Sequence, residues 1–118
     1  MRDFRTYHFW EQSHQLVLHI YKLTHSFPND EKFGITTQIR RAAISIPNNF
    51  AEGCGKNTYK KLARFLSIAY GSISELDYLI LLSLDLSYID RAHYDYIRNE
   101  IVSIQKQLYV LIHKSNVE

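Results

Sequence analysis

The stretch FGITTQIRRAAISIPNNFAEGCG, residues 33–55, decides the fold. Its apolar side chains recur every three or four residues, which is the spacing of one face of an α-helix: Ile35, Ile39, Ala42, Ile46 and Phe50. A second stripe at the same spacing is polar: Gln38, Arg41, Ser45, Asn49 and Glu52. The stretch therefore predicts one helix with an apolar face and a polar face.

Pro47 lies inside this predicted helix. A proline removes one backbone donor and clashes with the carbonyl four residues earlier, here that of Ala43. Because both stripes continue in phase past Pro47, we expect a kink in one helix rather than two helices. Gly53 and Gly55 are expected to end it, in the left-handed conformation that glycine often adopts after a helix.

Three further segments carry a helical apolar stripe. The first spans about residues 9–26 and ends at the turn-forming Phe27-Pro28-Asn29-Asp30. The next begins after a cap at Asn57 or Thr58, and the last follows a cap at Asp90 and precedes a polar tail, 113–118. Four helices of about 17 to 25 residues joined by short loops predict an all-α, antiparallel, up-down-up-down four-helix bundle, with residues 1–118 as one domain.

Composition excludes several classes of protein. With 46% hydrophobic residues the 118-residue chain should fold rather than remain disordered. The single cysteine, Cys54, allows neither a disulfide framework nor a cysteine metal cluster, and it fits a reducing cytoplasm. The first residues lack the apolar core of a signal peptide, and no run of about 18 apolar residues is present, so we expect a cytoplasmic protein without a membrane span.

The segment YLILLSLDL, residues 78–86, is apolar on nearly every side of its predicted helix. A helix of this kind is normally buried on every side, and one neighbouring layer in so small a domain cannot cover it. A subunit interface is therefore predicted there. Gly71, in the middle of the same helix, would be explained by the close approach of another helix.

Polar residues on two predicted helices form matching rows. The stripe on the second helix faces a row of small and polar residues on the third, so the rows are expected to pair within the bundle or between subunits, with Arg41 and Glu75 as an ion pair. The predicted interface residues are Gln38, Arg41, Ser45, Asn49, Glu52, Ser72 and Glu75.

Charge is unevenly distributed although the net charge is only +2. Residues 32–64 hold seven basic residues and one acid, Glu52. Four of the basic residues surround the start of the third helix, where cations oppose the helix dipole, and an anionic partner would offset that repulsion. We call Lys56, Lys60, Lys61 and Arg64 the basic pole. The predicted nucleic-acid-binding residues are this pole with Arg40, and with Arg2 and Arg5 as a flexible arm. A merely solvated basic face is the alternative.

Signals for catalysis or metal binding are weak. Glu11 with His14, and Asp90 with His93, have the spacing of di-iron ligands, but Asp90 is better explained as a cap. Glu52 and Glu75 could supply the remaining carboxylates, but nothing places all the ligands in one layer. The Gly53–Lys56 segment follows a helix rather than a strand and lacks the glycine spacing of a phosphate loop. We therefore predict a protein that is not an enzyme and has no metal and no cofactor.

Two motifs carry a resemblance to a known family. QIRRAAISIPNNFAEG, residues 38–53, preceded by FPNDEKFGIT, and FLSIAYGSISELDYLI, residues 65–80, resemble the small bacterial four-helix-bundle proteins encoded in intervening sequences of 23S ribosomal RNA genes. Phe50 departs from the usual aliphatic residue, and Cys54 lies between the two glycines.

The resemblance implies a homopentamer without established enzymatic activity. A related protein, the accessory variability determinant of diversity-generating retroelements, is a basic pentamer that partners a reverse transcriptase and nucleic acid. Two functions follow as hypotheses. The first is a non-enzymatic homo-oligomer that binds RNA or DNA phosphates through the basic pole. The second is a scaffold that docks an acidic protein, such as a polymerase, without contacting nucleic acid.

Overall fold

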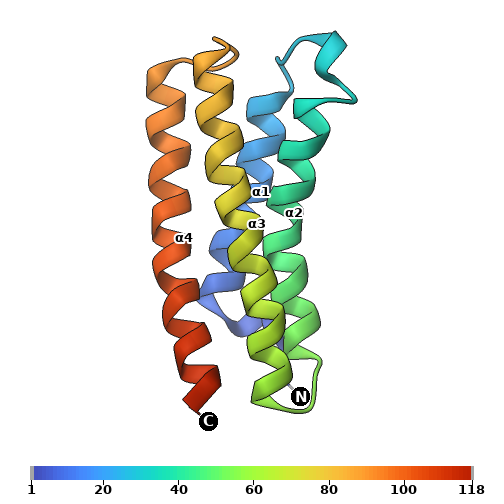
Figure 1. Cartoon of the computed structure of the whole chain (residues 1–118), viewed down its shortest axis with the longest axis vertical. Helices are drawn as coiled ribbons and strands as arrows, with labels where there is room; N and C mark the ends of the chain where they lie inside the picture. Colours follow the sequence, from blue (N-terminus) through green and yellow to red (C-terminus); the bar gives the residue numbers. More distant parts are fainter. Residues whose placement is uncertain (1, 118) are drawn as a thin grey trace.

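Four long helices make up the computed structural model, which describes residues 2–117 (Figure 1). The connections alternate between the two ends of the bundle, so successive helices run in opposite directions. The all-α four-helix bundle predicted from the sequence is confirmed, and no strand occurs within residues 2–117. The helices are α1 His8–Thr24, α2 Ile35–Cys54, α3 Tyr59–Asp85 and α4 Arg91–Val117, with short 3-10 turns η1 Phe4–Thr6 and η2 Asn29–Glu31.

The apolar stripe predicted on α2 faces the core. Ile39 and Ile46 are fully buried, and Phe50 is 1% exposed. The ring of Phe50 packs against those of Phe9 and Tyr7, with centroids 5.0 and 5.2 Å apart. The other helices contribute equally buried side chains to the same core: Leu16, Ile20, Leu66, Ile73, Leu76, Ile80, Ile101, Ile104 and Leu108.

Gly53 allows α2 to pack closely on α3. A Cβ atom at this position would lie 2.8 Å from Leu62 Cδ1 and 3.0 Å from Phe65 Cβ, both closer than van der Waals contact. The predicted left-handed glycine is wrong: no glycine in the described chain has a positive φ, and Gly55 has φ −78°. The helix nevertheless ends at Cys54, and the Gly55 N–H donates to the carbonyls of Ala51 and Glu52.

The starts of α3 and α4 are capped by residues that the sequence offered as caps. Thr58 Oγ1 accepts a hydrogen bond from the Lys61 amide at 3.1 Å, and Asp90 Oδ1 accepts one from the His93 amide at 2.8 Å.

Pro47 lies within one uninterrupted helix.

The predicted polar tail, residues 113–118, is helical in its described part, because α4 continues to Val117, and Glu118 lies outside the described residues. The buried face of α4 extends one turn beyond the predicted apolar seam, although the residue added, Ser115, is polar. Leu108 is fully buried, Leu111 is half-buried and Ser115 is 7% exposed, so positions at helical spacing still face the bundle. The last turn of α4 therefore lies beside the first turn of α3.

The outward face of α3 remains uncovered in the single chain. Tyr78 is 60% exposed and Leu81 43% exposed, and a Cβ at Gly71 would meet nothing within 4 Å. Within residues 2–117, no other helix therefore packs closely at Gly71. By length and hydropathy α3 also satisfies the criteria for a membrane span, with 33% of its most apolar window buried, but core helices of soluble proteins satisfy the same criteria.

Candidate nucleic-acid interface at the basic pole

The four residues of the basic pole lie at the end of the bundle that also holds both chain termini (Figure 1). All four side chains are exposed. Within residues 2–117, no acidic side chain forms an ion pair with any of them. Their charges are therefore available to an anionic partner.

The N-terminal segment is docked against the pole rather than forming the predicted flexible arm. The Arg2 amide donates to the Cys54 carbonyl, and Arg2 Nη1 donates to the Lys56 carbonyl, each at 3.2 Å. The Arg2 guanidinium also lies over the Tyr59 ring, 4.5 Å from its centroid. Arg5 instead pairs with Asp3 at 3.5 Å, which offsets part of its charge.

Two neighbouring hollows border the pole. One, of about 420 Å³, is lined by Lys60, Lys61, Ala63, Arg64, Ser67 and Asn116. The other, of about 350 Å³, is lined by Thr58, Tyr59, Lys60, Ser115 and Asn116. Lys60 and Asn116 belong to both. Sequence reasoning missed Asn116, because it placed this residue in a polar tail, although the helical spacing of Leu108 and Leu111 continues to Ser115.

Arg40 is not brought to the basic pole. It lies sixteen positions before Lys56, about 24 Å along a helix axis. Its Nε donates to Thr24 Oγ1 at 2.9 Å, and its guanidinium lies over the Tyr21 ring, 4.5 Å from the centroid. Arg40 therefore joins α2 to the end of α1, and we do not place it in the interface.

The predicted polar rows of α2 and α3 meet within the chain. Ser45 Oγ and Ser72 Oγ are 2.7 Å apart, and Asn49 Nδ2 donates to the Ser45 hydroxyl at 2.8 Å. Gln38, Arg41 and Glu75 lie along the same groove, a hollow of about 350 Å³, and are exposed.

The predicted ion pair between Arg41 and Glu75 is wrong for the single chain, since none forms between them within residues 2–117. Both side chains are exposed, and an ion pair in water gains little. Glu52 also faces solvent and accepts a hydrogen bond from Asn48 Nδ2 at 3.3 Å. The polar stripe therefore leaves several hydrogen-bonding groups uncovered beside α3.

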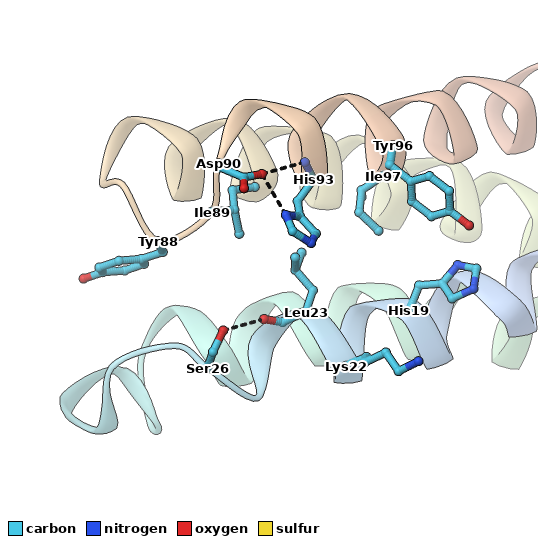
Figure 2. A pocket seen from close by; sticks show the side chains of 10 residues that line it. All are labelled: His19, Lys22, Leu23, Ser26, Tyr88, Ile89, Asp90, His93, Tyr96 and Ile97. Atoms are coloured by element: carbon cyan, nitrogen blue, oxygen red, sulfur yellow. Dashed lines mark hydrogen bonds and ion pairs between the residues drawn. The ribbon is translucent and has the colours of Figure 1, made fainter.

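A larger hollow, of about 520 Å³, lies at the opposite end of the bundle, between the end of α1 and the start of α4 (Figure 2). Its lining includes the apolar Leu23 and Ile97 and two histidines, each held by a carboxylate. His93 Nδ1 lies 2.7 Å from Asp90 Oδ1, and His19 Nδ1 lies 2.9 Å from Glu100. Each imidazole already has an anionic partner, which leaves Lys22 as the cation of this lining without an ion pair in residues 2–117, so the hollow offers fewer uncompensated cations than the basic pole.

Two observations bear on nucleophilic and metal chemistry. Cys54 is 1% exposed, and burial raises the pKa of its thiol, which disfavours the reactive thiolate. Within residues 2–117 no group of three or more His, Cys, Asp or Glu side chains is placed to hold a metal ion.

Comparison with known proteins places the chain in a family. The family model of the 23S rRNA-intervening sequence protein matches residues 5–110. The chain belongs to that family. A solved structure from the S23 ribosomal protein family, a protein of unknown function from Bacteroides thetaiotaomicron, has a TM-score of 0.79 and 26% identity to this family member. The match covers 88% of this chain and 97% of that one. No curated protein matches the sequence. The expected family and fold are thus confirmed.

Proposed function

We propose that this family member is a non-enzymatic, cytoplasmic homo-oligomer, with five copies as the family resemblance implies, that binds RNA or DNA phosphates through the basic pole. The observation that carries the proposal is the set of four exposed cations without ion-pair partners in residues 2–117, gathered around the start of α3. Arg2, which is tied to the same turn, adds a fifth positive charge.

The energetics of the isolated chain favour an anionic partner. Each cation near a helix N-terminus opposes the macrodipole by about 0.3–1 kcal/mol. Three of the four pole residues lie in the first turns of α3, and like charges on neighbouring positions repel further. A phosphate backbone would relieve both effects, and it would release counterions on binding.

Self-association is supported by a different surface. Tyr78 and Leu81 leave apolar area uncovered on α3, while the neighbouring α2–α3 groove presents Arg41 and Glu75. Apolar area next to directional polar groups is typical of subunit interfaces. Light scattering should give a mass about five times that of the 14.0 kDa chain, whereas a monomeric mass at micromolar concentration would contradict this part of the proposal.

Nucleic-acid binding is tested by charge reversal. Replacing Lys56, Lys60, Lys61 and Arg64 with glutamate should abolish binding of a labelled 20-nucleotide RNA at 50 mM salt. The matched control reverses four exposed cations outside the pole: Lys22, Lys32, Arg91 and Lys106. Both variants change the net charge equally. A loss of RNA binding in the pole variant alone therefore indicates that the RNA binds at the basic pole.

Salt dependence provides the second readout. With four phosphate contacts the logarithm of the binding constant should fall with the logarithm of the salt concentration with a slope of about −3 to −4. RNA binding that survives charge reversal at the pole would overturn the site assignment. If no nucleic acid binds but an acidic protein is retained after nuclease treatment, the scaffold hypothesis replaces this one.

A further inference from the structure

An exposed aromatic ring lies beside the basic pole. Tyr59, the first residue of α3, is 43% exposed and borders the hollow that also contains Lys60 and Asn116. One face of its ring carries the Arg2 guanidinium, 4.5 Å from the centroid.

Arg2 holds this ring in a defined position. Its own backbone and side chain are bonded to the carbonyls of Cys54 and Lys56, so the guanidinium is fixed to the α2–α3 turn. An aromatic ring supported on one side by a guanidinium retains a π-surface on the other, and that surface can stack a planar group without much loss of side-chain entropy.

The cationic and aromatic groups are arranged in sequence along the surface. Lys60 lines the hollow of Tyr59 and also the neighbouring hollow of Lys61 and Arg64. A strand whose base entered the first hollow would therefore bring its backbone past Lys60 and toward Arg64. Alternation of an aromatic platform with cations is typical of proteins that bind single-stranded nucleic acid.

We infer that the basic pole binds single-stranded nucleic acid, with an unpaired base stacked on Tyr59 and the flanking phosphates bound by Lys60 and Arg64. This inference rests on the proposed function, since it requires the pole to bind phosphates. A duplex satisfies only the phosphate contacts, because its bases are already stacked on one another and cannot reach the ring.

The test compares strands and variants at one salt concentration. Fluorescence anisotropy is measured with labelled 12-nucleotide oligo-U, oligo-dT and a 12-base-pair RNA duplex. The wild-type protein should bind the better single strand at least tenfold more tightly than the duplex. Tyr59→Ala should weaken single-strand binding on the order of tenfold, leave duplex binding unchanged and leave the salt slope unchanged, because no charge is removed.

Two further variants exclude a general loss of structure. Tyr59→Trp should retain single-strand binding, since an indole also stacks. Tyr70→Ala removes another exposed tyrosine of α3, at a position that borders neither hollow of the pole, and should have no effect. Circular dichroism confirms that each variant is folded.

The outcomes separate this inference from the proposed function. Tighter binding of either oligo-U or oligo-dT than of the duplex, lost in Tyr59→Ala, supports the inference and identifies the preferred sugar. Equal or tighter duplex binding, or an unchanged Tyr59→Ala, overturns the stacking site while phosphate binding at the pole stands. Absence of binding to all three probes overturns the proposed function itself.

Discussion

Replacing Gly53 with alanine is expected to destabilise the protein, because a methyl group at this position has no room between α2 and α3. The added Cβ would lie 2.8 Å from Leu62 Cδ1 and 3.0 Å from Phe65 Cβ. The end of the leucine side chain can rotate away, but the Phe65 Cβ is attached directly to the backbone of α3. Relief of the second contact therefore requires the two helices to move apart.

The expected magnitude combines two opposing effects. Overpacking of a well-packed core destabilises by about 1–3 kcal/mol. Alanine is favoured over glycine inside a helix by up to about 1 kcal/mol, which offsets part of that loss. The net expectation is a destabilisation on the order of 1 kcal/mol.

Urea unfolding followed by circular dichroism measures this difference, at equal protein concentration because the proposed subunit association would contribute to stability. Gly55→Ala is the matched control in the same turn. Gly55 has φ −78°, which alanine adopts readily, and its added Cβ would come no closer than 3.4 Å to any atom. A Gly53→Ala variant as stable as the wild type, or a Gly55→Ala variant destabilised equally, would refute the close-packing argument.

Four further predictions concern other parts of the fold. Phe50→Ala should lose about 3–5 kcal/mol of unfolding free energy in the same assay, since the ring is 1% exposed and packs on two aromatic neighbours. Asp90→Ala should be less stable than the wild type at pH 7. The hydrogen bond from the His93 amide lowers the pKa of Asp90 from 3.8. The difference in unfolding free energy between the wild type and Asp90→Ala should therefore shrink as the pH falls below 3.8 and through the lowered pKa. A difference that stays constant with pH would contradict this. Cys54 should react with a thiol reagent at pH 8 only at the rate of unfolding or local opening, as its thiol is 1% exposed and its pKa is raised, and rapid labelling of the folded protein would disagree. If a second copy packs on Gly71, Gly71→Ala should shift the oligomer toward monomer in light scattering on dilution. If no copy packs there, the substitution should raise the unfolding free energy by about 1 kcal/mol, because the position is open and alanine favours a helix.

The proposed surfaces occupy different parts of the bundle, so their functions are separable by mutation. The basic pole lies at the end with the termini, whereas the exposed apolar side chains of α3 include Tyr78 and Leu81, more than ten residues further along the helix. Charge reversal at the pole should therefore leave the oligomeric mass unchanged. An oligomer would also place several poles on one particle, and multiple contacts along a nucleic-acid chain raise the apparent affinity without any new contact.

Local signals in the sequence determined the four helices, the all-α class and the caps at Thr58 and Asp90. Apolar spacing and capping depend on residues within one or two turns, so they can be read without knowing how the helices pack. The family motifs were equally local, and the match over residues 5–110 agrees with them.

The sequence also predicted that the polar rows of α2 and α3 would meet, but other contacts between distant segments were decided by the tertiary structure. Asn116 lies beside Lys60 although the two are far apart in the chain, Arg2 is docked on the α2–α3 turn rather than part of a flexible arm, and Arg40 is directed to α1. These outcomes depend on the rotation and register of each helix against its neighbours. A helical stripe indicates which face is buried, but it does not say which residue of another helix lies opposite, because many registers bury the same apolar area.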